Sequence, residues 1–229
     1  MMKKILFTAF VLGSFMIAHG QEKSGYQMPP KAIVEIIDAP QTPGVLVSPD
    51  DKTILLLDRA GLVSIAELSG PELRLAGIRI NPVTNSQSRG QGVTGISSMN
   101  IDGTNIRPLT GLPADAKLGG VSWSDDSRWF AFTNTTDNGV ELWVADAAAM
   151  TVKKIDEGLN NIFMRTRSWM PDGSIIYLRT LRERGNAPSA SRVPAGPSVQ
   201  ESAGRQGESR TFQDLLQNVD DEKMFEYYG

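Results

Sequence analysis

The sequence predicts an all-β protein, and three observations carry this prediction. Short runs rich in β-branched and aromatic residues alternate with turns of Gly, Pro, Asp and Ser, and long helical patterns are few. One strand-turn-strand pattern recurs three times along the chain. Two further hairpin patterns stand between the copies. Together they favour a partial β-propeller of about three blades, with a short helix near the C-terminus.

The recurring pattern is an apolar strand end, a tight turn and a second apolar strand. Its copies are residues 47–56 (VSPDDKTILL), 123–132 (WSDDSRWFAF) and 169–178 (WMPDGSIIYL). Pro or a polar residue begins each turn, Asp accepts local backbone hydrogen bonds, and Gly or a small polar residue closes it. The second and third copies start 46 residues apart, which fits the roughly 40 to 50 residues of a four-stranded blade. The first gap, of 76 residues, must contain an insertion.

The two further hairpins supply the remaining strands of the blades. Residues 140–146 and 151–155 complete a blade between the second and third copies. Residues 96–101 and 106–109 flank a turn at 102–105 that begins with Asp-Gly, a strong hairpin signal. Because a propeller closes with about four to eight blades, three blades predict an incomplete domain, residues 21–229, that continues beyond this sequence. An ordinary β-sandwich with a chance similarity of turns is the alternative.

Residues 1–20 have the pattern of a secretory signal peptide. Lys3 and Lys4 precede an apolar run from Ile5 to Ala18, and small residues follow, which predicts cleavage near Gln21. We expect an exported protein, periplasmic or secreted, without membrane contact after cleavage. The alternative is an uncleaved membrane anchor, which needs about 20 apolar residues.

Charge and composition exclude several functional classes. Cleavage would remove two of the 23 basic residues and none of the 26 acidic ones, which leaves a formal charge of −5 and no general attraction for nucleic acid. The chain has no Cys, and its one histidine, His19, lies in the expected signal peptide. The mature chain therefore lacks the groups for Ser-His-Asp catalysis, for Cys-His catalysis and for a zinc site built on His or Cys. A site made of carboxylates alone stays open, and we expect no metal, cofactor or catalytic residue.

Two glycine-containing motifs lack the context that their chemistry needs. The nearest match to the nucleophile elbow Gly-x-Ser-x-Gly, residues 95–99, has no final Gly and lies on an expected strand. Gly90, Gly92 and Gly95 match a dinucleotide-binding fingerprint, but no buried strand precedes them and no helix follows. We interpret this stretch as a loop.

Acidic pairs and tryptophans have structural interpretations. The acidic pairs are Asp50-Asp51, Asp125-Asp126 and Asp220-Asp221. The first two pairs are expected as turn residues, with calcium binding or acid-base work as the alternative. The tryptophans are Trp123, Trp129, Trp143 and Trp169. All four lie on expected strands, where we predict packing between blades rather than ligand stacking.

The C-terminal part changes character. Residues 181–210 are rich in Pro, Gly, Ser and Arg, which predicts a long loop or a disordered insert. Thr211 is expected to cap a helix, with Asp214 in a capping-box position. The apolar face of that helix would consist of Phe212, Leu215, Leu216 and Val219. Residues 220–229 would follow as an acidic, aromatic tail.

Several segments together point to a known family. They are residues 25–31 (GYQMPPK) through 36–40 (IIDAP), 75–80 (LAGIRI) with Asn85 and Arg89, 194–197 (PAGP) and 211–216 (TFQDLL). In this order and spacing they resemble the glutamyl endopeptidase branch of the prolyl oligopeptidase family, including the chloroplast glutamyl peptidase type. The resemblance covers nearly all of the mature chain.

The resemblance implies a division of labour between two domains. Similar proteins have an amino-terminal propeller that caps a carboxy-terminal α/β-hydrolase domain with a Ser-Asp-His triad. No triad position exists in this chain, so peptidase activity is implied only for a longer parent protein. The chain's partner would be its own hydrolase domain, its ligands peptides, and its role to restrict which peptides reach the active site.

Selectivity for Glu would require a cation near the substrate side chain, because a buried carboxylate is costly unless it is paired. Arg79 and Arg89, with Asn85 between them, are the candidate substrate-binding residues. A surface salt bridge or a turn contact is the alternative for each arginine.

Two other functional classes remain as hypotheses. A free-standing propeller resembling the periplasmic TolB type would bind protein partners and catalyse no reaction. A carboxylate-based glycoside hydrolase on a propeller would need more than the acidic pairs described above.

Overall fold

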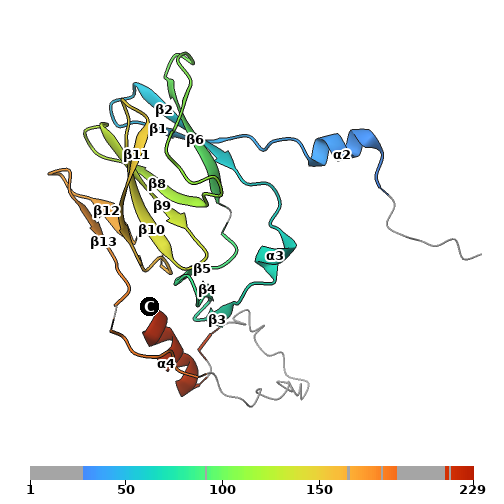
Figure 1. The fold of residues 1–229 in the computed structure, drawn as a ribbon, viewed down its shortest axis with the longest axis vertical. Coiled ribbons are helices and arrows are strands. Elements are labelled where there is room, and N and C mark those ends of the chain that lie inside the picture. The colour runs from blue at the N-terminus through green and yellow to red at the C-terminus, as the bar shows by residue number, and fades with distance from the viewer. Residues whose placement is uncertain (1–27, 91, 164–165, 182, 190–214, 217) are drawn as a thin grey trace, which may run out of the picture. The chain divides into compact units, whose positions relative to one another are not determined.

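The structure is a computed structural model that describes residues 28–90, 92–163, 166–181, 183–189, 215–216 and 218–229 (Figure 1). The predicted signal peptide, most of the predicted 181–210 insert and the predicted helix start at Thr211 and Asp214 lie outside these residues. The chain divides into two units, Met1–Ala39 and Pro40–Gly229.

The described part of the first unit contains one short helix, α2 (Lys31–Ile37), which the sequence did not lead us to expect. It begins directly after Pro30, whose carbonyl accepts hydrogen bonds from the N–H groups of Ile33 and Val34. Lys31 and Glu35 form an i,i+4 pair at 3.5 Å. No residue of α2 is buried, so the helix makes no core of its own.

The second unit is built on an eight-stranded antiparallel sheet that consists of two four-stranded meanders. The strands of the first meander are β1 (Gly44–Val47), β2 (Thr53–Arg59), β6 (Val93–Asn100) and β7 (Arg107–Pro108). Those of the second meander are β8 (Leu118–Trp123), β9 (Trp129–Thr135), β10 (Val140–Asp146) and β11 (Thr151–Glu157). A single residue pair, Val93 with Leu118, joins the two meanders in register. The third hairpin follows, β12 (Arg167–Trp169) with β13 (Ile175–Tyr177).

This architecture confirms the prediction of a mostly β fold, and both predicted outer hairpins form. It also explains the long first gap between the repeats. Residues 60–92 form an insert between β2 and β6, and its elements are α3 (Ile65–Leu68), β3 (Leu73–Leu75), β4 (Ile78–Asn81) and β5 (Ser86–Gln87). The three strands of the insert make a small sheet of their own. The first meander is therefore a complete four-stranded unit, which the sequence pattern indicated only for the second.

The turns of the first two repeats have the same hydrogen bonds. Ser48 Oγ donates to Asp50 Oδ1 at 2.7 Å, and Ser124 Oγ donates to Asp126 Oδ1 at 2.7 Å. In both turns the backbone N–H two residues after the Asp donates to the same carboxylate, and the residue between has a left-handed φ, 56° or 59°. The interpretation of these acidic pairs as turn residues is confirmed. The two turns also touch, since the backbone N–H of Asp50 donates to Ser127 Oγ at 3.0 Å.

The third repeat closes with a turn that is one residue shorter. The N–H of Met170 donates to the carbonyl of Ser174, four residues on, whereas Ser48 spans five residues to Thr53. Asp172 again accepts from the following polar residue, here the N–H of Ser174 at 2.9 Å. The equivalent of the left-handed residue is a glycine with φ 82°, which accounts for the Gly in this copy.

The second meander is buried on both faces. Phe130 and Phe132 of β9 are fully buried in the core shared with the first meander. Ala131, which points to the opposite face, lies in a second core against Trp169 and Ile175 of the third hairpin. Because side chains of a strand alternate between faces, β9 has apolar residues at successive positions. The two meanders and the third hairpin are therefore packed in succession, face to face.

Two tryptophans make equivalent contacts between successive repeats. Trp123 Nε1 donates to the carbonyl of Leu46 at 3.4 Å, and Trp169 Nε1 donates to the carbonyl of Ser122 at 3.2 Å. Trp123 is buried, and Trp143 packs half-buried against the same core. The predicted packing role holds for these three residues. It is wrong for Trp129, which is 37% exposed because it begins β9 with its side chain outside the core.

The C-terminal helix is α4 (Val219–Tyr228). Asn218 caps it by accepting from the N–H of Asp221 at 2.9 Å, and three acidic residues fill its first turn, where they complement the helix dipole. The prediction that residues 220–229 form a tail is therefore wrong, because Asn218 supplies a cap downstream of the expected one. The helix packs on the insert through a core of Leu75, Ile80, Ile162, Met224 and Tyr228. None of the helices in the described ranges is long and apolar enough to span a bilayer.

Candidate functional site

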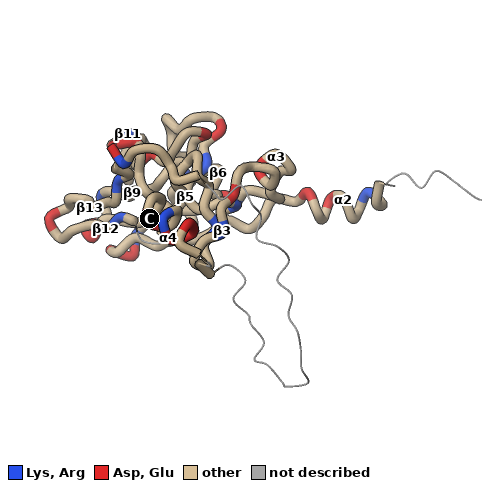
Figure 2. The backbone as a smooth tube through the Cα atoms, turned by 90° about the horizontal axis from the view of Figure 1, so that it is seen from below, with Lys and Arg blue, Asp and Glu red and all other residues tan. Residues whose placement is uncertain are grey.

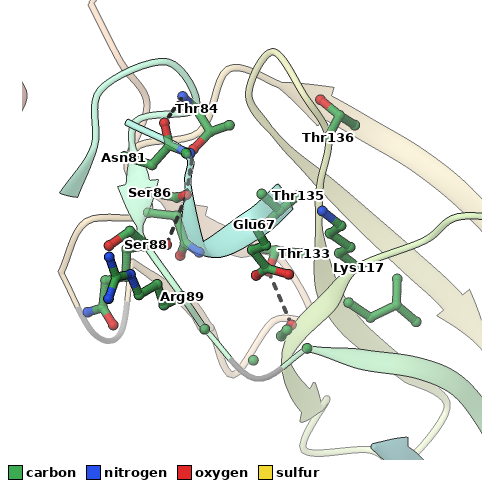
Figure 3. A pocket seen from close by; sticks show the side chains of 18 of the residues that line it. Glu67, Asn81, Thr84, Ser86, Ser88, Arg89, Lys117, Thr133, Thr135 and Thr136 are labelled. Carbon is green, nitrogen blue, oxygen red and sulfur yellow. Dashed lines mark hydrogen bonds between the residues drawn. The ribbon is translucent and has the colours of Figure 1, made fainter. Parts of the chain in front are cut away.

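The second unit contains a pocket of about 830 Å³ between the insert and the second meander. In Figure 3, Ser88 and Arg89 of the insert lie on one side, Lys117 and Thr133 lie on the other, and Glu67 of α3 lies between them. The wall thus carries polar side chains and both signs of charge among its apolar surface. Basic and acidic residues are likewise interspersed along the elements in Figure 2.

Local turn chemistry holds the insert's side of the pocket. Asn81 Oδ1 accepts from the N–H of Val83 at 3.0 Å, and the hydroxyls of Thr84 and Ser86 are 2.8 Å apart. Ser64 caps α3 by accepting from the N–H of Glu67 at 3.1 Å. These contacts fix the polar side chains of the insert without help from the large sheet.

Arg79 and Arg89, the predicted substrate-binding arginines, are brought together by a carboxylate. Glu72 lies 2.9 Å from Arg89 Nε, 3.9 Å from Arg79 Nη1 and 3.1 Å from Arg74 Nε. The hydroxyl of Ser88 donates to Glu72 at 2.6 Å. This hydrogen bond is the main cause that holds the pKa of Glu72 below its ordinary value, and the arginines contribute less. Each arginine therefore has a salt bridge, and three cations share one anion.

Asn85, the third predicted residue, has different contacts. Its side chain is almost fully buried, and its backbone has a left-handed φ of 53°. Its Oδ1 accepts from Arg184 Nη1 at 2.8 Å, and its Nδ2 donates to the carbonyl of Tyr228 at 3.4 Å. Asn85 thus contacts the C-terminal helix rather than the cluster around Glu72. A substrate-binding role for the three residues stays a prediction.

Arg167, a pocket residue that the sequence did not single out, has an unusual environment. Its guanidinium lies directly over Gly120 of β8, where a Cβ at residue 120 would be 2.8 Å from Nη2 and 2.9 Å from Nη1. Within the described ranges this guanidinium has no hydrogen bond or ion pair, and its Nε is fully buried. Burial lowers the pKa of Arg167 to about 10, so the group stays cationic at neutral pH. A sequence signal that could have indicated it is the Gly119-Gly120 pair, since glycine in a strand marks close approach of another group.

The described residues carry no arrangement for acyl transfer or metal binding. The nearest nucleophile-elbow match lies in β6, where Ser97 and Ser98 pair with Pro108 and Arg107 of β7. Gly90 and Gly92 precede the same strand and lie outside any helix or strand, as the loop interpretation predicted. That interpretation is wrong for Gly95, which lies within β6. Among the described residues, no three His, Asp or Glu side chains lie close enough to hold a metal ion. What the pocket offers chemically is recognition of a polar or charged ligand.

Two curated plant proteins are similar to this chain. Both are named probable chloroplastic glutamyl endopeptidases, one from Oryza sativa subsp. japonica and one from Arabidopsis thaliana. Each is 34% identical to the chain over 219 or 220 residues, which is 90% of this chain. The chain spans only 23% of the length of these relatives. No protein-family model matches it. The similarity supports a peptidase-related protein, as the sequence resemblance implied.

Proposed function

We propose that this chain is the noncatalytic, amino-terminal propeller portion of an exported serine peptidase. Its blades would restrict which peptides reach an α/β-hydrolase domain that lies outside this chain. The observation that carries the proposal is the similarity of 90% of the chain to 23% of two proteins named glutamyl endopeptidases. A match of this extent is what one module of a much longer enzyme produces.

The packing of the repeats supports the interpretation as blades. In a two-layer β-sandwich each sheet buries one face and exposes the other. The second meander instead buries Phe132 on one face and Leu142 on the other, against separate neighbours. Radial repetition of four-stranded sheets accounts for this arrangement.

The distribution of reactive groups supports a noncatalytic role. The only imidazole is that of His19, and no thiol exists in the sequence. A serine in this chain would therefore have no histidine to accept its proton once the proposed export signal, marked by Lys3 and Lys4, is removed. The catalytic groups would come from the longer parent.

The cluster around Glu72 supports a role in recognising acidic peptides. Arg74, Arg79 and Arg89 together carry three positive charges against one carboxylate. Such a cluster retains capacity for a further anion, and Arg79 remains 47% exposed. Asn85 would act indirectly, by holding Arg184 and the C-terminal helix beside the insert.

The test compares the uninterrupted gene product with its Arg79→Ala and Arg89→Ala variants on peptides that differ only in Glu or Gln. We expect the gene product to cleave after Glu and each variant to lose preference for Glu. Unchanged preference in both variants would discard the two arginines. A gene product without peptidase activity that captures a protein partner would favour the TolB-like binding module instead.

A further inference from the structure

The guanidinium of Arg167 is a largely buried cation without an anionic partner among the described residues. Moving a charged group out of water is costly unless it is paired and hydrogen-bonded. The other arginines beside the pocket obey this rule, since Arg79 and Arg89 share Glu72. In the part of the chain that the structure describes, the Arg167 side chain has no ion pair, and its buried Nε has no hydrogen-bond partner.

The strand beneath this guanidinium is shaped to receive it. The register of β8 against β9 shifts between Gly119 and Ser122, which marks a bulge. Gly120 within the bulge has a left-handed φ of 54° and no side chain, so the Nη1 and Nη2 edge of Arg167 can approach its backbone closely. Bulges of this kind re-aim groups beside functional sites. The strand therefore departs from regular pairing at the point where the cation lies.

The surroundings of Arg167 form part of the same pocket. Gly119, Gly120 and Thr133 line it together with Arg167, and Thr133 Oγ1 donates to the carbonyl of Gly119 at 3.2 Å. Of the pocket's acidic residues, Glu72 is occupied by three arginines, and neither Glu67 nor Asp137 forms an ion pair with Arg167. The pocket is large enough to admit a peptide side chain or a chain end.

We propose that Arg167, seated over the Gly120 bulge, binds a carboxylate of a peptide ligand in this pocket. The Nη1 and Nη2 atoms are not among the fully buried atoms, and their outer N–H groups can donate charge-assisted hydrogen bonds to a carboxylate oxygen. The inference rests on the proposed function for its choice of a peptide as ligand. It differs from the Arg79 and Arg89 prediction because those two arginines already have an acid.

The carboxylate has two chemical sources, an acidic side chain or the C-terminus of the peptide. The test is calorimetric titration of the full chain with three short peptides of the same frame. The first is amidated and contains one Glu, the second is amidated with Gln in its place, and the third is the Gln peptide with a free C-terminus. If the first peptide binds at least tenfold more tightly than the amidated Gln peptide, the ligand carboxylate is that of a side chain. If the third peptide does so, the ligand carboxylate is the C-terminus. Equal binding of all three overturns the proposal.

The variants separate carboxylate binding from a structural role. In the Arg167→Met variant, the affinity for the favoured peptide should fall to that for the amidated Gln peptide. The midpoint of thermal unfolding should stay unchanged or rise, because the substitution removes an unpaired desolvated charge. Arg167→Lys keeps the charge without the guanidinium donors and should lose part of the preference for the carboxylate peptide. This variant provides the test if the Met variant does not fold. Arg128→Met, at an exposed arginine outside the pocket wall, is the matched control and should bind as the original chain does. Full preference retained in Arg167→Met or in Arg167→Lys would overturn the proposal.

The result is separable from the proposed function, because no catalytic domain takes part in the titration. If the chain binds the carboxylate but its gene product has no peptidase activity, the Arg167 site is kept and the peptidase proposal is overturned. If the three peptides bind equally and the gene product cleaves after Glu, the peptidase proposal is kept and the Arg167 site is overturned.

Discussion

Trp169 donates its indole N–H to the carbonyl of Ser122 at 3.2 Å. Trp123, at the equivalent position of the preceding repeat, donates in the same way to Leu46 at 3.4 Å. Leu46 immediately precedes Val47, which aligns with Trp123 in the repeats, and Ser122 immediately precedes Trp123, which aligns with Trp169. One spatial relationship therefore connects the first repeat to the second and the second to the third. Repetition of this kind supports the proposed blades, since each blade of a propeller contacts its neighbour in the same way.

The first prediction concerns these tryptophan contacts. Trp123→Phe removes the hydrogen bond to Leu46 and part of a buried ring, so it should reduce the free energy of unfolding by about 1–3 kcal/mol. Trp129→Phe is the matched control, because Trp129 is 37% exposed, and it should change the free energy by less than about 0.5 kcal/mol. Urea denaturation of both variants measures the difference. Equal effects of the two substitutions would contradict the role given to Trp123.

The second prediction concerns the attachment of the C-terminal helix. Arg184 donates to the carbonyl of Tyr227 at 3.1 Å and to Asn85 at 2.8 Å, and its guanidinium lies 4.2 Å from the centre of the Tyr227 ring. Arg184→Met should therefore speed amide hydrogen exchange in α4 at least about fivefold, equivalent to about 1 kcal/mol of local opening. Lys223→Met, which removes only an exposed pair at 3.9 Å, is the control. Unchanged exchange after loss of Arg184 would show that the apolar core alone holds the helix.

The third prediction is a dependence of stability on pH that comes from the repeat turns. The hydroxyl of Ser124 and the backbone N–H of Arg128 hold the pKa of Asp126 below its ordinary value of 3.8. The folded state therefore binds this proton more weakly than the unfolded state. The turn contributes its full stability above pH 3.8 and loses it as the pH falls through the lower, folded-state pKa.

Asp126→Asn should accordingly weaken the loss of stability on acidification, measured by thermal unfolding between about pH 5 and 2. It should not abolish that loss, because Asp50, Asp102 and Asp172 have pKa values lowered in the same direction. Asp125→Asn, at the exposed neighbouring position, should keep the original profile. Identical profiles for the two variants would contradict the role of Asp126.

The fourth prediction tests the fit of Arg167 over Gly120. Gly120→Ala places a Cβ 2.8 Å from the guanidinium at a left-handed φ, so it should destabilise the fold by about 1–3 kcal/mol. In an Arg167→Ala background the steric part of this cost disappears and only the backbone strain remains. Gly139→Ala, which meets nothing within 4 Å, is the control. Additive effects of the substitutions at 120 and 167 would show that the two residues do not contact each other in solution.

The features predicted best from the sequence are those determined by local chemistry. The Ser48 and Ser124 turns could be predicted because Asp, Ser and left-handed residues specify such turns within a few positions. The insert could be inferred from the 76-residue gap, although nothing in the sequence indicated that it would form a separate sheet.

The features that escaped prediction depend on contacts between distant segments. Arg167 and Gly120 are 47 positions apart, and no local pattern shows that they touch. The salt bridges of Arg79 and Arg89 with Glu72 likewise require the fold of the insert. The C-terminal helix was misplaced because Thr211 and Asp214 offered a conspicuous capping pattern upstream of the cap at Asn218.

The proposed function requires that this chain bind and restrict peptides without cleaving them. The most direct test incubates the purified chain with an internally quenched peptide that contains Glu and follows the release of fluorescence. The account predicts no hydrolysis above a buffer blank, whereas the uninterrupted gene product cleaves the same peptide. Hydrolysis by the chain alone, reduced by substitution of its pocket residues, would contradict the account.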